Sequence, residues 1–138
     1  MDSPVRITRA IEFSSSLRYA SADLDEAGNR ERFGAAAFRH GHNYRLEVTL
    51  SGHPDPVTGM VVNLADLKLL LEREIMERFD HRDLNDDTPY FEKRPPTPEN
   101  VATVIFEILR EAVPAQTPLS IRLHQDADLF VDIRGSSR

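Results

Sequence analysis

The chain has 138 residues, of which 17 are Lys or Arg and 23 are Asp or Glu, giving a formal net charge of -6. This length suits one domain with its own core, and 40% hydrophobic with 29% charged residues is a globular composition. The acidic balance argues against broad nucleic-acid binding, and no apolar run approaches the roughly 20 residues of a membrane span. We therefore expect a single domain over residues 1–138, with neither a nucleic-acid nor a membrane partner.

Cysteine content and the first residues bear on the compartment. The absence of cysteine excludes disulfides, thiolate metal ligands and a cysteine nucleophile. Residues 1–6 lack the charged-then-apolar pattern of a signal peptide. We expect a cytoplasmic protein.

The first half of the chain predicts two strands and a long connection. Alternating and β-branched residues predict a strand from Val5 to Phe13. Residues 20–34 are charged, small and punctuated by glycine, which predicts a loop with a helical turn near residues 25–32. Alternation from Asn43 to Ser51 predicts a second strand, paired with the first.

Two helices and two short strands follow. Asn63 is expected to cap a helix that runs to about Arg78, with an apolar stripe of Leu64, Leu67, Leu71, Ile75 and Met76. Thr97 and Pro98 have the residue types of an N-cap and a first helical position, and Pro114 ends this second helix. Strands are predicted from Leu119 to His124 and from Leu129 to Ile133.

The order of these elements is β-β-α-α-β-β. It predicts an α+β protein in which a four-stranded antiparallel sheet carries two helices on one face. Such a sheet leaves two open edges, so we expect a homo-oligomer that pairs or covers them.

Two histidines at the entry of the second strand are candidate metal ligands. His40 and His42 are separated by Gly41, and alternation places both imidazoles on one face. Catalytic zinc takes three protein nitrogens or oxygens and an open position, so the pair supplies two of three ligands. Two uncoordinated histidines are the alternative.

A second candidate lies in the polar stretch after the first helix. In Asp80-His81 a carboxylate beside an imidazole can orient the ring and raise its basicity, which is the arrangement of a general base. The alternative is a solvated turn.

Read together, four motifs carry a family resemblance. They are His40-Gly41-His42-Asn43-Tyr44, the run from Asp55 to Lys68, Phe79-Asp80-His81-Arg82-Asp83-Leu84-Asn85, and Thr97-Pro98-Glu99-Asn100-Val101-Ala102. In this order and spacing they resemble the 6-pyruvoyl-tetrahydropterin synthase family, which includes the bacterial 6-carboxytetrahydropterin synthases. The resemblance runs from about Ile11 to Gly135.

The resemblance implies a fold, an assembly and a chemistry. The fold is the tunnelling fold, in which trimers close their sheets into a barrel, two trimers form a hexamer and active sites lie between subunits. The family's lyase chemistry uses a three-histidine zinc site and a Cys/Asp/His set on the side chain of dihydroneopterin triphosphate. A glutamate on the third strand holds the pterin ring. Carried onto this chain, the resemblance assigns metal-ligand positions to His40 and His42, catalytic positions to Asp80 and His81, and pocket positions to Thr97 and Glu99.

Three positions depart from the family pattern. Leu17 stands at the position of the first zinc histidine, Ala36 is the nearest counterpart of the cysteine, and Gln125 falls at the position of the ring-holding glutamate. Loss of a ligand weakens a zinc site unless another donor replaces it, so zinc is in doubt. An amide offers one donor and one acceptor, which suits an N–H/C=O ring edge better than the N–H/NH₂ edge of a pterin.

Three functions follow from these residues. The first is a diverged enzyme that uses Asp80-His81 as an acid/base pair on a pterin-like heterocycle, with an altered reaction. The second is a non-catalytic paralogue that binds such a heterocycle. The third is an orthodox 6-pyruvoyl- or 6-carboxy-tetrahydropterin synthase.

Overall fold

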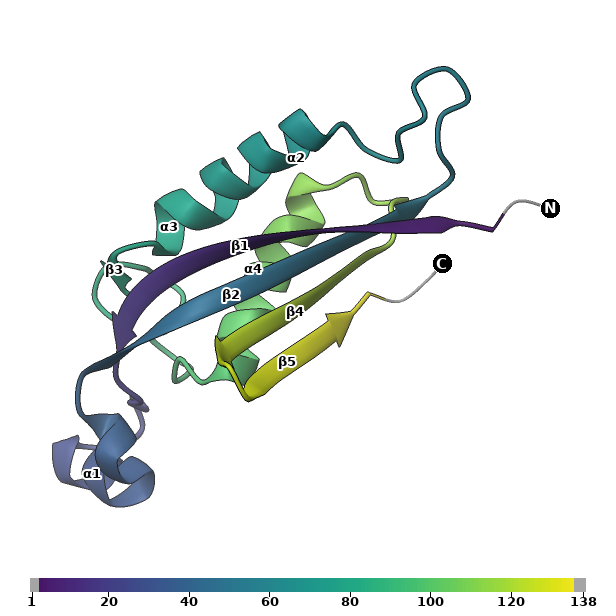
Figure 1. Ribbon diagram of the computed structural model, residues 1–138. Coiled ribbons are helices and arrows are strands. Elements are labelled where there is room, and N and C mark those ends of the chain that lie inside the picture. The colour runs from purple at the N-terminus through teal and green to yellow at the C-terminus, as the bar shows by residue number, and fades with distance from the viewer. Residues whose placement is uncertain (1–2, 136–138) are drawn as a thin grey trace.

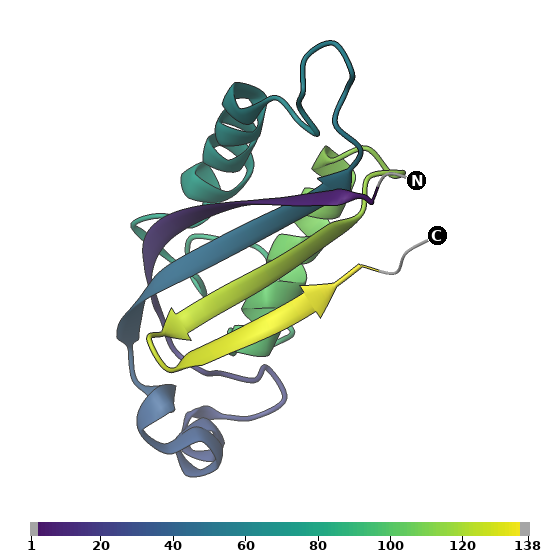
Figure 2. The same ribbon diagram turned by 45° about the vertical axis from the view of Figure 1, so that its right-hand side comes forward.

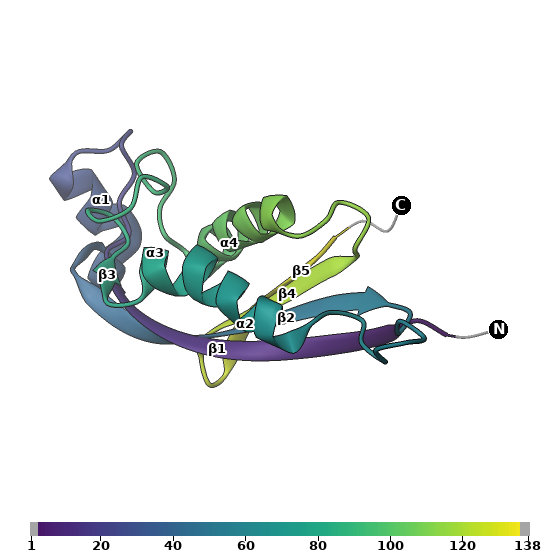
Figure 3. The same cartoon turned by 90° about the horizontal axis from the view of Figure 1, so that it is seen from above.

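The computed structural model describes residues 3–135. The strands are β1 (Val5–Leu17), β2 (His40–Gly52), β3 (Arg82–Asp83), β4 (Leu119–Asp126) and β5 (Leu129–Arg134). The helices are α1 (Glu26–Phe33), α2 (Leu64–Leu71), α3 (Glu77–Phe79) and α4 (Pro98–Ala112). Viewed from above, α2, α3 and α4 all lie on one face of the sheet, and α1 lies beyond its end (Figure 3). Among the described residues, no helix is long and apolar enough to span a membrane.

The sheet is α+β as predicted, but it has five strands in the order β3-β1-β2-β4-β5. Four of them form the expected antiparallel set, which is seen face-on in Figures 1 and 2. The fifth, β3, contains two residues and pairs with β1 in parallel, with Ser15 opposite Arg82 and Ser16 opposite Asp83. A two-residue strand in a polar segment has no periodicity to detect, and the prediction of four strands missed it for that reason.

The longest pairing joins β1 to β2 over thirteen residue pairs, from Val5↔Gly52 to Leu17↔His40. Both strands are longer than predicted. β1 continues through Ser14–Leu17, and β2 begins with His40–His42 ahead of the predicted start at Asn43, in segments that lack β-branched residues. The extension matters for the candidate site, because it places His40 and His42 within the sheet, opposite Leu17 and Ser15.

The predicted helix from Asn63 to about Arg78 is continuous in space and comprises α2, a π-helical turn (Glu72–Met76) and α3. Asn63 caps it by accepting from the backbone N–H groups of Ala65 and Asp66. Buried side chains follow every fourth residue, namely Leu67, Leu71, Ile75 and Phe79. That spacing drifts by about 40° a step in a regular α-helix, and the wider π turn offsets the drift. Leu64, expected in the apolar stripe, is instead 47% exposed at the helix start.

The second predicted helix is α4, capped by Thr97 Oγ1, which accepts from the N–H of Asn100 with Pro98 in the first turn. Its inner face buries Val101, Val104, Ile105 and Leu109 against the sheet. Each such burial contributes about 1.5–3 kcal/mol. A further short helix, α1, forms within the long connection, where Asp25 caps it by accepting from the N–H of Gly28.

Asp83 fastens β3 to the rest of the sheet and is only 7% exposed. Its carboxylate accepts from Ser16 Oγ at 2.8 Å and from Arg39 Nη1 at 2.7 Å. It also accepts from the backbone N–H groups of Asn85 and Asp86, both at 3.0 Å. Hydrogen bonds to a buried charge are stronger than neutral ones, and the groups they satisfy would otherwise be left unpaired.

Asp83→Ala is expected to lower the free energy of unfolding by about 2–4 kcal/mol, because it leaves buried partners unsatisfied. The matched control is Asp86→Ala, which removes an exposed carboxylate paired to the same arginine and is expected to cost about 0–1 kcal/mol. Urea unfolding of both variants measures the two values. Equal losses would contradict the anchoring role of Asp83.

Candidate functional site

The predicted histidine pair lies at the start of β2, on the same face of the sheet as the buried Tyr44. The two imidazole rings are 5.1 Å apart between centroids and almost perpendicular. His40 Nδ1 is 2.8 Å from the carbonyl oxygen of Phe38, which can only accept. His40 Nδ1 therefore carries the proton, and its Nε2 is left with a free lone pair. His42 Nδ1 lies 3.4 Å from Asp126 Oδ1.

Leu17 faces this pair from the neighbouring strand. The register places Leu17 opposite His40 and Ser15 opposite His42, so all four side chains share one face. Leu17 is 0% exposed and belongs to the hydrophobic core. The Ser15 hydroxyl donates to the carbonyl oxygen of Phe79 at 2.7 Å and is therefore engaged.

Two buried polar atoms on this side of the sheet have no hydrogen-bond partner within residues 3–135: the Tyr44 hydroxyl and Gln125 Oε1. Tyr44 stacks on Phe13 and meets His42 edge to face. Burial, and after it the charges of Tyr19 and Asp126, raises the pKa of Tyr44 well above its ordinary value. Gln125 Nε2 donates to Asp126 Oδ2 at 3.3 Å, which leaves its carbonyl oxygen available to a donor.

The predicted Asp80–His81 pair forms on the other side of β1, in the segment between α3 and β3. The backbone N–H of Ser14 donates to Asp80 Oδ1 at 2.9 Å, and the backbone N–H of His81 donates to the Ser14 carbonyl oxygen at 2.7 Å. Asp80 Oδ2 is 3.0 Å from His81 Nδ1. His81 has a φ of 58°, a left-handed conformation that only a minority of non-glycine residues adopt. Its side chain is 84% exposed.

This arrangement is the one that a general acid/base pair needs. Asp80 Oδ2 lies close to His81 Nδ1, which favours the proton on that nitrogen and leaves the exposed imidazole with Nε2 as its basic atom. The Ser14 N–H, and after it the His81 side chain, hold the pKa of the Asp80 carboxyl below its usual range. The carboxylate is therefore charged at neutral pH.

The remaining predicted pocket residues lie at the start of α4 and in the turn before β2. Thr97 uses its hydroxyl as the α4 cap, and Glu99 is exposed in the first turn, near enough that its charge contributes to the raised pKa of Tyr19 after burial. Ala36 lies in the 3₁₀ turn Gly34–Ala37, and its carbonyl oxygen accepts from the N–H of Tyr19. The Tyr19 ring in turn contacts His40, so these residues gather at one end of the sheet.

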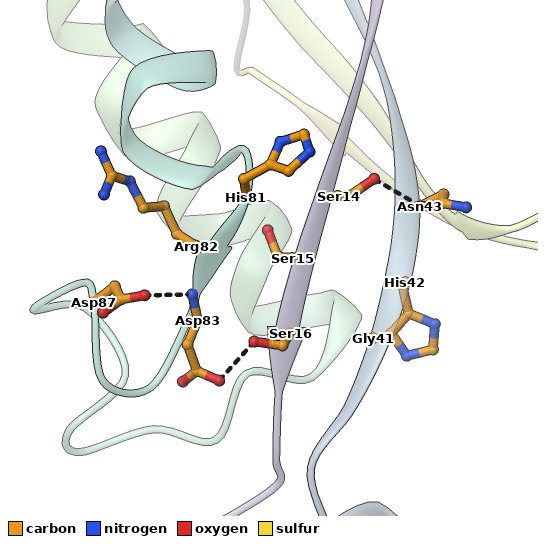
Figure 4. A pocket seen from close by; sticks show the side chains of 10 residues that line it. All are labelled: Ser14, Ser15, Ser16, Gly41, His42, Asn43, His81, Arg82, Asp83 and Asp87. Carbon is orange, nitrogen blue, oxygen red and sulfur yellow. Dashed lines mark hydrogen bonds between the residues drawn. The ribbon is translucent and has the colours of Figure 1, made fainter.

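Within one chain, the His40–His42 pair and the Asp80–His81 pair do not contact one another. A surface depression of about 500 Å³ crosses β1, β2 and β3 and is lined by both His42 and His81. Figure 4 shows the His81 imidazole beside β1 near Ser14, whereas the His42 imidazole projects from β2 on the side away from β1. The two rings do not point toward one another.

The donor set of the histidine pair does not fit a three-ligand zinc site. Zinc needs at least three nitrogen, oxygen or sulfur donors converging at about 2.0–2.3 Å. Across residues 3–135 no group of three or more His, Cys, Asp or Glu side chains is placed to hold a metal ion. Leu17, opposite His40 on the neighbouring strand, is a buried alkyl side chain and offers no donor atom.

The chain is therefore an α+β protein with helices on one face of its sheet and a histidine pair at one end of that sheet. Residues 6–136 match the family described as "6-pyruvoyl tetrahydropterin synthase", and the chain belongs to this family.

Individual relatives support the same assignment. The chain is 44% identical to a "6-pyruvoyl tetrahydrobiopterin synthase" of Poecilia reticulata over 131 residues, covering 94% of this chain and 89% of the relative. It is 39% identical to the Homo sapiens protein of the same description over 132 residues, covering 94% and 91%. The solved Caenorhabditis elegans 6-pyruvoyl tetrahydropterin synthase superposes with a TM-score of 0.88 at 33% identity, covering 97% of each chain.

Three residues of this region were not anticipated from the sequence: Tyr44, Tyr19 and Asp126. Tyr44 belongs to the motif that begins at His40, and alternation with His42 was the signal for its position. Tyr19 and Asp126 lie in a loop and beside a turn, where no periodicity predicts which way a side chain faces.

Asp80→Asn is expected to lower stability at pH 7 and to change how stability depends on pH. Because the pKa of Asp80 is depressed in the fold, its stabilising contribution is present above the unfolded-state value of about 4 and is lost as the pH falls through the folded-state value. The stability gap between the native protein and the variant is therefore expected to narrow below about pH 4.

Urea unfolding at a series of pH values measures this gap. Asp128→Asn, in the exposed β4–β5 turn, is the control for the loss of one negative charge. A gap for Asp80→Asn that stays constant from neutral to acid pH would contradict stabilisation of the carboxylate by Ser14.

Proposed function

We propose that the protein is a tetrahydropterin synthase, a lyase that acts on the side chain of a reduced pterin such as dihydroneopterin triphosphate. The family match over residues 6–136 and the relatives named 6-pyruvoyl tetrahydrobiopterin synthase support this. They favour the orthodox activity over the altered reaction that the three sequence departures suggested. Those departures, at Leu17, Ala36 and Gln125, are residues of this chain that the comparisons do not test.

The oriented imidazole of His81 carries the proposal. Its Nε2 takes a proton from a carbon of the substrate side chain and returns one, while Asp80 stabilises the imidazolium. This is the residue pair that the chain retains for proton transfer, since it has no thiol. No step is assigned to a metal, because the residues present do not fit one.

Gln125 is the proposed ring anchor. Its carbonyl oxygen is buried without a partner within residues 3–135, and a ring N–H is the kind of donor that would satisfy it. Thr97 and Glu99, at the start of α4, are proposed for the wall of the same pocket.

The site is proposed to form between copies of the chain. His81 is 84% exposed, and its imidazole is not directed at the His40–His42 pair in the same subunit. The depression that His81 lines leaves the imidazole exposed, so a second copy is proposed to supply the opposing wall. The sheet also leaves the β5 edge, and most of the β1 edge, open to pairing.

Binding without turnover is the second candidate, and one observation favours it. By the family resemblance, Leu17, which is buried, and Ala36 stand at the positions of a zinc ligand and a cysteine, and neither side chain can bind metal or carry a proton. A protein with these substitutions would keep a pocket for the heterocycle but would lack one zinc ligand and the thiol.

His81→Ala is expected to reduce the release of inorganic triphosphate from dihydroneopterin triphosphate by about 10²–10⁴-fold, the usual contribution of a general base. His53→Ala, an exposed histidine in the turn after β2, is the matched control and is expected to keep full activity. Size-exclusion chromatography of both variants checks that the assembly is unchanged.

The outcomes separate the candidates. Turnover by the native protein that His81→Ala leaves unaltered would contradict the role of His81. Recovery of the substrate unchanged, together with a raised Tm in its presence, would identify a binding protein. Neither turnover nor binding would overturn the proposed substrate class.

Co-expression tests whether one site draws on two chains. Gln125→Ala, which removes the proposed ring anchor, and His81→Ala are each expected to lose most of the activity alone. When the two variants are mixed in one oligomer, about a quarter of the sites combine a native Gln125 with a native His81 from different chains. Activity should then return to about a quarter of the native value. No recovery in a verified mixed oligomer would place both residues of a site in the same chain.

A further inference from the structure

We infer that Leu17 is the single side chain that keeps this protein from holding zinc at the His40–His42 pair. The protein as it stands does not retain stoichiometric zinc there, and Leu17→His completes a three-nitrogen site. This inference goes beyond the proposed function and does not rest on it.

The β1–β2 register places position 17 where a third ligand would have to be. Leu17 lies directly opposite His40, and cross-strand neighbours in an antiparallel sheet have Cβ atoms about 4.5–5.5 Å apart. The His40 and His42 rings already lie 5.1 Å apart between centroids. A third imidazole at position 17 would therefore lie on the same face of the sheet as His40 and His42, directly beside His40.

The hydrogen bond of His40 is consistent with such a site. The contact between His40 Nδ1 and the Phe38 carbonyl oxygen fixes the proton on Nδ1 and leaves Nε2 as the donor atom. A hydrogen bond of this kind orients a metal-bound imidazole in many zinc proteins. The geometry of His40 is thus already that of a ligand, and what is missing is a third donor.

No neighbouring side chain takes the place of that donor. Ser15, opposite His42, donates its hydroxyl proton to Phe79. Asp126 Oδ1 is 3.4 Å from His42 Nδ1, so this carboxylate pairs with that ring nitrogen of His42. Within residues 3–135, no set of three candidate ligands converges here.

Leu17 instead contributes to the core, with 0% exposure among Phe13, Tyr44 and their neighbours. An alkyl side chain in that position excludes water and offers no lone pair. A histidine there would be buried without a partner in the absence of metal, and zinc would supply the partner.

The experiment measures zinc per chain by elemental analysis after purification without chelators or nickel affinity. The native protein is expected to contain well under one zinc per chain, and added Zn²⁺ that is then removed by gel filtration should not raise it. Leu17→His is expected to contain about one zinc per chain and to bind Zn²⁺ at least about 100-fold more tightly than the native protein, as measured by competition with a chelating dye.

Two control variants isolate the ligand effect. Leu17→Asn introduces a polar side chain of similar size and is expected to leave zinc content unchanged. Leu17→His combined with His42→Ala is expected to lose the gain. If Leu17→His does not fold, Leu17→Cys supplies a thiolate at the same position and must show the same gain.

Stoichiometric zinc in the native protein would overturn the inference, as would folded Leu17→His or Leu17→Cys protein without a gain. Because the readout is metal content, these results do not depend on whether the protein turns over a pterin. A failure of the inference and a failure of the proposed function are therefore distinguishable.

Discussion

The pairing of β1 with β2 is the constraint from which the rest of the site follows. Thirteen consecutive residue pairs fix which side chains of one strand face those of the other. A shift of one residue would turn every side chain to the opposite face, so the buried residues of both strands hold the register. That register sets Phe13 against Tyr44, Ser15 against His42 and Leu17 against His40. The pairing of β1 with β2 therefore determines which side chains are neighbours at this end of the sheet, whatever the conformation of the loops.

The second cluster depends on the same strand through its opposite edge. Ser14 offers a backbone N–H and a carbonyl oxygen at the edge of β1, and Asp80 and His81 bind one each. This satisfies backbone groups that would otherwise be open for pairing. It also forces His81 into its left-handed conformation and holds its imidazole in solvent. Protection of a strand edge and orientation of a base are achieved by the same contacts.

Much of this arrangement could be predicted from the sequence, and the limits have physical causes. Periodicity located the four long strands and both main helices, and the caps at Asn63 and Thr97 are those expected. The adjacency of Asp80 and His81, and the shared face of His40 and His42, follow from local spacing. In contrast, β3 is too short to have a period, and its place was set by the contacts of Asp83. The separation of the His40–His42 pair from the Asp80–His81 pair depends on the tertiary structure, and residue spacing in the sequence does not predict it.

A leucine and a metal ion are alternative ways to organise the end of this sheet. A metal ion holds its ligands by coordination and requires deprotonated, converging donors. Leu17 holds the same region by packing with Phe13 and Tyr44, at no cost in buried polar groups. In this chain an apolar side chain therefore fills that position at the end of the sheet. Among residues 3–135, the Tyr44 hydroxyl and the Gln125 carbonyl oxygen are the buried side-chain polar atoms without a hydrogen-bond partner. In the proposed function, recognition at this site rests on hydrogen bonds to a ligand, and proton transfer rests on the separate Asp80–His81 pair at the edge of β1.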